Sequence, residues 1–521
     1  MDWPADSTWR AVVSAALVGT ERQPFKPLTA SGTLGQVLTA LTHQPTEGAL
    51  LKAVTAISLH QQAGWLPEND VSPKQEPCPV DQWPRCSARA SRFLQHILQG
   101  QYAQLLPEWL AAATRFQHRV PEMLLPQLLD LGRQQRDLRA AILPVLGQRG
   151  RWLANQNADW RYAVEVATTA DWETGAMAAR SLYLKELRSQ DPDRARDLLA
   201  ATWSQEPAGD RTKFLETFQV GLSLEDEPFL EEALRDRSKE VRRIAADLLA
   251  RLPQSRLCQR MASQVQKYIS FNPGDSSGLT IRLPDSLDPA LVQDGVEAKP
   301  TPLATKQVGE KAWWLLQMVG ATPLNTWNET WEVPAIDIVL AAKNHEWEAA
   351  LLDGWALATQ RQQNAQWAKA LLEVWLAEAA TRTAVVPEVR LNTLLNILPI
   401  EQQNGVLVAF LKSARGHLND STTLWLLRSL NSWGAKLAET VLNALEDYLS
   451  QNSLATTLPW GLLSALKEFG QFIPIECLPR VVQLRESLPP ESLWIAGTEE
   501  LLALLRFRQD MLQAFELPDS G

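Results

Sequence analysis

The stretch EEALRDRSKEVRRIAADLLARLP, residues Glu231–Pro253, decides how this chain folds. Within Val241–Leu252, apolar side chains recur at intervals of three and four residues, at positions 241, 244, 245, 248, 249 and 252. This spacing predicts a helix with one buried face. The preceding segment, PFLEEALRD (228–236), predicts a shorter helix that begins near Pro228. Because only a few residues join the two helices, we expect them to pack as antiparallel neighbours.

Two polar residues mark this predicted hairpin. Asp236 lies in the turn, where its carboxylate can accept hydrogen bonds from the free N–H groups that begin the second helix. Arg242 lies one turn inside that helix, where it can reach an acidic group in a neighbouring turn. A functional alternative is that the two form a binding or acid–base pair. We prefer the structural interpretation, a helix cap and a stacking contact.

The order of helix, Asp-bearing turn and Val-Arg pair resembles a HEAT repeat. In that family the Asp and Arg form a ladder between stacked units. A single unit cannot bury both faces of its helices, so neighbouring units must stack on it. The resemblance therefore implies an all-α chain, a HEAT-like α-solenoid of stacked antiparallel helix pairs.

A second internal repeat lies further along the chain. WEAALLDGW (347–355) and WAKALLEVW (367–375) align without gaps, and each places two tryptophans and a leucine on one helical face. The pair predicts another antiparallel helical hairpin. It lacks the Asp–Val-Arg unit, so we expect a helical repeat of a different local design.

Two proline-rich stretches interrupt the helical pattern. Residues 65–86 predict an irregular loop, and residues 272–309 predict a longer irregular segment that excludes helices. Within the second, LTIRL (279–283) alternates like a short strand. We therefore predict an N-terminal HEAT-like helical domain at 1–271, an irregular linker at 272–309 and a C-terminal helical-repeat domain at 310–521.

Composition limits the class of protein. The chain has 521 residues, too many for one compact core, which usually stops growing at about 250–300 residues. The net charge of -10 disfavours nucleic acid and anionic membranes as general partners. We see no signal peptide and no apolar run near the ~20 residues that span a bilayer. With only four cysteines, we expect a cytoplasmic protein without a disulfide framework.

The sequence contains no recognisable catalytic constellation. It has no GxxxxGK[ST] phosphate loop, no HExxH and no GxSxG. Cys78, Cys86 and His96 lack a CxxC pair and a fourth ligand, so we do not expect a zinc site. The acidic run at 225–227 precedes a helix, where we expect it to cap. We predict no catalytic, cofactor-binding or metal-binding residues, and hence no cofactor.

Two compositional features point to binding. The chain has 21 tryptophans, which either line a groove that stacks bases or holds peptides, or fill the spaces between helices. Their helical spacing favours the second interpretation. A local basic cluster is formed by Arg235, Arg237, Lys239, Arg242 and Arg243. It is interpreted as a solvated face, with an acidic partner as the alternative.

Several phrases together resemble an uncharacterised bacterial family, a domain of unknown function. They are WRAVVSAALVGTERQPF (9–25), LGQRGRWLANQNADW (146–160), the opening stretch, and GEKAWWLLQMVGATPLNTW (309–327). The family brings no established activity. The resemblance implies a set of neighbouring genes, because members of the family are encoded near MoxR-type AAA ATPases, von Willebrand A-domain proteins and SWIM zinc-finger proteins.

These observations lead us to expect a non-catalytic protein-interaction scaffold or adaptor, serving a MoxR-type AAA ATPase or von Willebrand A protein system. Two alternatives come from enzymes with HEAT-like folds. One is a DNA glycosylase-like enzyme, which uses Trp, Tyr, Asp and basic residues on a concave face. The other is a bilin lyase-like protein, which acts on chromophores and Cys-bearing partners.

Overall fold

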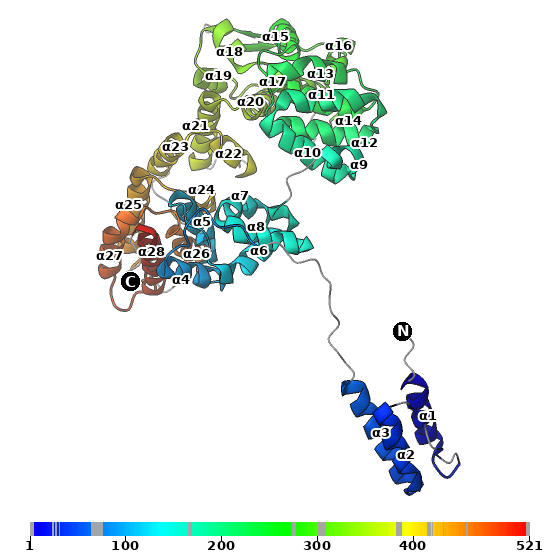
Figure 1. The fold of residues 1–521 in the computed structure, drawn as a ribbon. Helices are drawn as coiled ribbons and strands as arrows, with labels where there is room; N and C mark the ends of the chain where they lie inside the picture. Colours follow the sequence, from blue (N-terminus) through cyan, green and yellow to red (C-terminus); the bar gives the residue numbers. More distant parts are fainter. Residues whose placement is uncertain are drawn as a thin grey trace. The chain divides into compact units, whose positions relative to one another are not determined.

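The computed structural model describes residues 5–22, 25–26, 29–30, 32–63, 77–164, 169–272, 278–300, 309–381, 388–413, 418, 420–430, 432–454 and 457–516. The chain divides into two compact units, Met1–Pro77 and Cys78–Gly521, which we describe separately. The described residues of both units form helices joined mostly by short connections (Figure 1). Strands among these residues are limited to one short hairpin. The chain is therefore all-α.

The first unit contains three helices: α1 (Ala5–Val18), α2 (Gly32–Ala40) and α3 (Thr46–Ala63). Both α1 and α2 pack against α3. Their inward residues, including Val12, Leu38 and Ile57, form a small core of their own. The structure thus gives this unit a separate hydrophobic core.

The second unit opens with helices that pack against the end of the chain. These are α4 (Ala88–Leu98), α5 (Leu106–Arg115), α6 (Leu125–Gln134), α7 (Arg139–Ile142) and α8 (Gly147–Gln156). The last helix, α28 (Ile495–Glu516), contacts α4 and α5. Arg508 donates to Glu108 at 2.8 and 2.7 Å, and the rings of Phe93 and Phe507 meet edge to face at 4.9 Å. Helices far apart in sequence therefore share one core.

The next helices contain the opening stretch. They are α9 (Thr169–Thr174), α10 (Met177–Gln190), α11 (Pro192–Thr202), α12 (Ala208–Glu216), α13 (Glu227–Ala233), α14 (Lys239–Leu249) and α15 (Arg256–Tyr268). Helices α13 and α14 pack together, and the predicted stripe of α14 is buried. The expected hairpin is confirmed.

The polar details of this hairpin differ from the sequence prediction. Ser238, not Asp236, is the N-cap of α14, and its hydroxyl accepts from the Val241 N–H. Asp236 instead accepts from the Ser238 N–H at 2.8 Å and from Arg211 of α12 at 3.1 Å. Arg242 donates to the backbone carbonyls of residues 236 and 237, rather than to an acidic group. Asp236 thus contacts α12, through Arg211 rather than through Arg242.

Parts of the segment 272–309 belong to the described residues, at 272, 278–300 and 309. Strands β1 (Ile269–Phe271) and β2 (Leu279–Ile281) pair antiparallel, which confirms the short strand. The expected exclusion of helices was wrong, because α16 (Pro289–Gln293) begins at a proline that suits the first helical turn, with Asp288 as its N-cap. Residues 273–277 and 301–308 lie outside the described residues. The domain boundary placed at 272–309 stays a prediction.

The remaining helices continue as packed neighbours. They are α17 (Glu310–Ala321), α18 (Leu324–Trp331), α19 (Ala335–Ala341), α20 (Glu348–Gln362), α21 (Ala365–Thr381), α22 (Glu388–Leu395), α23 (Ile400–Ser413), α24 (Ser421–Ser429), α25 (Ala435–Gln451), α26 (Trp460–Phe469) and α27 (Leu478–Glu486). One hydrophobic cluster of buried residues runs from Trp172 to Leu505. The assignment of these hairpins to the HEAT type stays a prediction.

The tryptophan repeat forms the expected pair of helices, α20 and α21, which contact each other across a short turn. The rings of Trp355 and Trp367 lie 5.6 Å apart inside this pair. Gly354 lets α17 approach α20 closely, because a Cβ at that position would lie 2.8 Å from the side chain of Val319. In the first proline-rich stretch, residues 64–76 lie outside the described residues, and residues 77–86 are irregular as predicted.

Candidate binding groove

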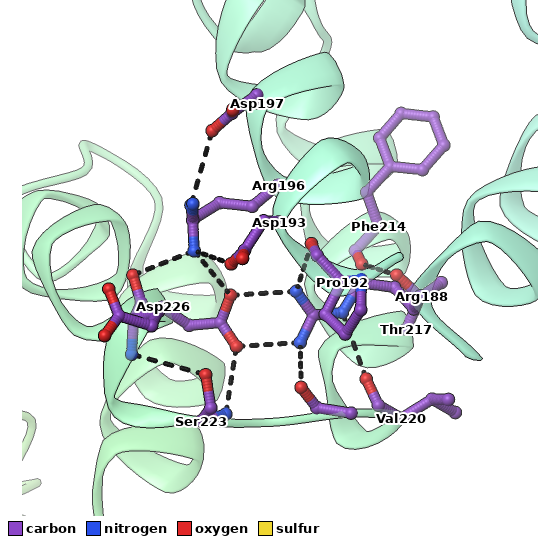
Figure 2. A network of polar contacts seen from close by, with 12 residues as sticks. Arg188, Pro192, Asp193, Arg196, Asp197, Phe214, Thr217, Val220, Ser223 and Asp226 are labelled. Carbon is purple, nitrogen blue, oxygen red and sulfur yellow. Dashed lines mark hydrogen bonds and ion pairs between the residues drawn. The ribbon is translucent and has the colours of Figure 1, made fainter. Parts of the chain in front are cut away.

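A buried ion pair joins α10 to the turn before α13. The guanidinium of Arg188 makes two parallel hydrogen bonds to Asp226, at 2.8 and 2.7 Å, and both side chains are 0% exposed (Figure 2). Three backbone carbonyls, those of Pro192, Val220 and Gly221, accept the remaining Arg188 hydrogen bonds at 2.8–3.0 Å. Every hydrogen-bonding nitrogen of Arg188 is therefore engaged inside the protein.

The Asp226 carboxylate also accepts a hydrogen bond at the start of a short helix. Asp226 accepts from the Ser223 N–H at 3.1 Å in a capping box of the short 3-10 helix Leu224–Asp226, so this one member of the acidic run caps there and not at the start of α13. Gly221 has a φ of +63°, and a Cβ there would approach the carbonyl oxygen of residue 188 to 2.8 Å. A side chain at position 221 would thus disturb the turn that supplies an acceptor to Arg188. We assign the pair a structural role, because the side chains of Arg188 and Asp226 are both fully buried.

Similar pairs recur between neighbouring helices. Arg180 of α10 donates to Glu206 at 3.0 Å, and this bond from Arg180 lowers the pKa of Glu206 despite burial. Arg260 of α15 bridges Glu231 and Asp294, with closest distances of 3.1 and 2.7 Å. These arginines are neutralised by carboxylates of the same chain. The pairs therefore connect helices rather than form acid–base sites.

A further pair links α14 to α20. Arg361 donates to Asp247 at 3.0 Å and to the Gly320 carbonyl at 2.9 Å. Burial raises the pKa of the Asp247 carboxyl, but Arg361 and Arg251 outweigh burial and lower it overall. Asp247 is therefore a charged packing residue, unsuited to accept a proton near neutral pH.

The basic cluster predicted around residue 240 separates into paired and unpaired residues. Lys239 lies 3.1 Å from Glu297, and Arg243 pairs with Glu240. Arg242 donates to backbone carbonyls, as described above. Arg235 and Arg237 are exposed, and neither side chain has a partner among the described residues. Among the described residues, these two are the members of the cluster whose side chains have no ion-pair or hydrogen-bond partner.

Both unpaired arginines line a surface groove of about 770 Å³. Its wall is made by the short 3-10 helix Trp203–Gln205, by α12 and α13, by the turn before α14 and by the start of α15. Besides Arg235 and Arg237, the lining includes Trp203, Glu232 and Arg256. This volume falls within the roughly 300–1,000 Å³ typical of ligand pockets.

Trp203 gives the groove an aromatic wall. Its ring meets Phe229 edge to face at 5.0 Å, and the guanidinium of Arg211 lies 5.5 Å from its centroid. The ring is half-buried, and its Nε1–H has no acceptor among the described residues. The groove thus offers an apolar surface and a hydrogen-bond donor beside two cations.

Nine other tryptophans among the described residues are buried in the core, as their helical spacing predicted. Those less than a tenth exposed are Trp109, Trp172, Trp314, Trp327, Trp355, Trp367, Trp375, Trp433 and Trp494. Trp460, at the start of α26, is 82% exposed. The interpretation of tryptophan as filler between helices is confirmed at the buried positions, and Trp203 is the ring placed in the groove.

The cysteines do not assemble a reactive centre in the described residues. All four are free thiols. Cys86 is buried, with its Sγ 3.3 Å from the Ser91 hydroxyl, and burial raises the pKa of Cys258 to about 11. In the described part of the chain, no group of three or more His, Cys, Asp or Glu is arranged to hold a metal ion. Nor is any described helix both long and apolar enough to cross a bilayer.

Comparisons with known proteins place the chain in a family without assigning it a function. No curated protein and no solved structure matches it. A single family model spans nearly all of the chain, from residue 11 to residue 515, and this agrees with the resemblance noted in the sequence. The chain belongs to DUF5691, a family of unknown function.

Proposed function

We propose that this chain is a non-catalytic scaffold or adaptor that binds a protein partner. The observation that carries the proposal is the groove beside Trp203, where Arg235 and Arg237 have no partner among the described residues. Arg211, which also lines the groove, is neutralised within the chain by Asp236.

The partner in this proposal is a MoxR-type AAA ATPase or a von Willebrand A-domain protein. Its support is the set of neighbouring genes that the family resemblance implies, which is an associational argument. The cellular location in this proposal is the cytoplasm, and its support is that all four cysteines are free thiols. A stacked arrangement of HEAT-like helix pairs would give such a scaffold an extended binding surface.

A second candidate is an enzyme acting on DNA bases. The observation in its favour is that an indole, a carboxylate and several arginines line the same groove, at Trp203, Asp236, Arg235 and Arg237. Against it, the side chain of Asp236 is only 7% exposed and pairs with Arg211. Asp236 is therefore unsuited to face a substrate, and we favour the scaffold.

Affinity purification tests the proposal. The tagged full chain is recovered from its own cells at near-physiological salt, half of the sample is treated with nuclease, and co-purifying proteins are identified by mass spectrometry. Recovery of an AAA ATPase or a von Willebrand A protein in both halves is the expected result. Partners that disappear with nuclease, or recovery of nucleic acid alone, would contradict it and favour the DNA-directed alternative.

A further inference from the structure

We propose that the groove binds an acidic segment of the partner protein, with carboxylates at Arg235 and Arg237 and an apolar side chain against Trp203. This inference rests on the proposed scaffold function and names the chemistry of its partner. The inference depends on which charged side chains around the groove are paired within the chain and which are unpaired.

The two arginines flank a carboxylate that is already in use. Asp236 lies between Arg235 and Arg237 in sequence, but it accepts from Arg211 and from the Ser238 N–H. Arg211 is nearly buried, so this pairing is part of the helix packing. The nearest acid in sequence is therefore held by another arginine. The two exposed guanidinium groups face solvent, and an outside carboxylate can bind them with charge-assisted hydrogen bonds.

The other charged groups at the groove are mostly paired. The guanidinium of Arg256 lies 3.5 Å from Glu227, and Glu231 pairs with Arg260. Glu232 is exposed and has no partner among the described residues. The unpaired set therefore combines two cations and one anion. That set suits a polypeptide. Its carboxylates can bind the two arginines, and its backbone N–H groups can donate hydrogen bonds to Glu232.

The aromatic wall adds the second part of the recognition. Trp203 is fixed in place by Phe229 and Arg211, so it loses little conformational freedom when a ligand packs on it. Its indole N–H is free to donate to a peptide carbonyl. A segment with acidic residues spaced by an apolar residue uses the cations and the ring together.

Nucleic acid fits the groove less well. A strand presents a regular series of phosphates, and sites that bind it are dominated by unpaired positive charge. Here Glu231, Glu232 and Asp236 share the lining with the arginines. The whole chain also carries a net charge of -10. The mixed lining therefore favours a protein segment.

The test uses the purified full chain and a fluorescein-labelled short peptide of alternating glutamate and leucine. Anisotropy is measured at low salt and at about 0.5 M salt, where exposed charge pairs are screened. We expect binding that weakens with salt and is lost with the analogue that has glutamine for glutamate. The double variant R235Q/R237Q should bind about tenfold more weakly, since each exposed pair contributes modestly.

A matched control keeps the change in net charge the same. R92Q/R506Q also removes two exposed arginines, one on α4 and one on α28, and neither lines the groove. Its peptide binding should equal that of the wild type. Trp203→Phe retains a ring against Phe229 and removes the N–H, so we expect a loss of about threefold. Melting temperatures of all variants confirm that they are folded.

Four results would overturn the inference: equal binding of the glutamine analogue, wild-type affinity in R235Q/R237Q, tighter binding of a single-stranded oligonucleotide than of the acidic peptide, or recovery of the wild-type partners from cells by R235Q/R237Q. Its failure is separable from that of the scaffold. If R235Q/R237Q still recovers the wild-type partners from cells, the scaffold stands and the groove is not its site. If no protein co-purifies with the wild type but the peptide binds as expected, the scaffold fails and the acidic-peptide site stands.

Discussion

Residues 177–272 and 310–381 are both built of packed helices, but different side chains join their helices. In the first region, arginines bind carboxylates of neighbouring helices and turns, as in Arg188–Asp226 and Arg211–Asp236. In the second, indoles contact one another, with Trp355 5.9 Å from Trp327 and 5.6 Å from Trp367. Ion pairs thus add directional hydrogen bonds between helices in the first region. In the second, contacts between aromatic rings add packing beside single hydrogen bonds such as that from the Trp367 indole to Asn328.

The difference explains why the candidate groove lies in the first region. In a region rich in charged side chains, any residue without an oppositely charged partner keeps an unpaired charge. Arg235 and Arg237 are two such residues. Aromatic packing leaves no comparable charge. In the second region Trp327 and Trp355 bury Nε1 atoms that have no hydrogen-bond partner among the described residues, so their contribution is packing alone.

The largest expected effect is at the centre of the polar region. Asp226→Ala leaves the Arg188 guanidinium buried without its carboxylate, and should lower the free energy of unfolding by ~3–5 kcal/mol. Urea unfolding followed by circular dichroism measures this. The double variant R188M/D226L removes both charges and should be more stable than Asp226→Ala. If the double variant is as unstable as the single one, the pair does more than balance its own charges.

An effect of similar size is expected in the aromatic region. Trp355 is fully buried, so Trp355→Ala should cost ~3–5 kcal/mol through the cavity it leaves. The variants Trp355→Phe and Trp367→Phe together test whether an indole hydrogen bond adds to the packing. The Trp367 indole donates to Asn328 at 2.9 Å, whereas that of Trp355 has no partner. Trp367→Phe should therefore cost ~1–2 kcal/mol more, and equal melting temperatures would contradict this.

A smaller effect is expected at the turn before α14. Asp236→Ala removes the acceptor of both Arg211 and the Ser238 N–H, and should cost ~1–3 kcal/mol. The α14 cap itself should persist, because it belongs to Ser238. Ser238→Ala should therefore destabilise independently, with the two losses nearly additive in thermal unfolding. Strong non-additivity would show that the turn and the cap act as one unit.

The smallest effect is a change in pH dependence. Arg180 lowers the pKa of Glu206 below its ordinary value of 4.5, so the ionised pair stabilises the folded state at neutral pH. This contribution is present above pH 4.5 and is lost as pH falls toward the lower folded-state pKa. Glu206→Gln should cost ~1 kcal/mol or less at pH 7, since Arg180 is partly solvated, and its stability should decline less steeply below pH 4.5 than that of the wild type. An unchanged slope would contradict the pairing.

The helices were predictable from the sequence because their periodicity is strong. The stripe of α14 and the tryptophan repeat of α20 and α21 are patterns within one helix, and both are confirmed. The helix at Pro289–Gln293 was missed because its proline was interpreted as a breaker, although proline suits the first turn of a helix. The division between Met1–Pro77 and Cys78–Gly521 was also not anticipated.

The ion pairs and the groove were less predictable because they join residues distant in sequence. One signal was present: Arg188 follows Leu184 and Leu187 on an apolar helical face, and an arginine in such a stripe needs a buried partner. Its partner, Asp226, could not be chosen among many acids without the fold. Likewise, sequence grouped five basic residues around position 240, but only the structure separated the paired from the unpaired ones.

The contact between α28 and helices α4 and α5 has a consequence for how the protein is made. Arg508 and Glu108 are 400 residues apart in the chain, and the pairing closes a long loop. During translation, the apolar faces of α4 and α5, with Trp109 among them, lack their contact with α28 until that helix has been synthesised. A product cut short before Ile495 would keep those faces exposed for chaperones and proteases.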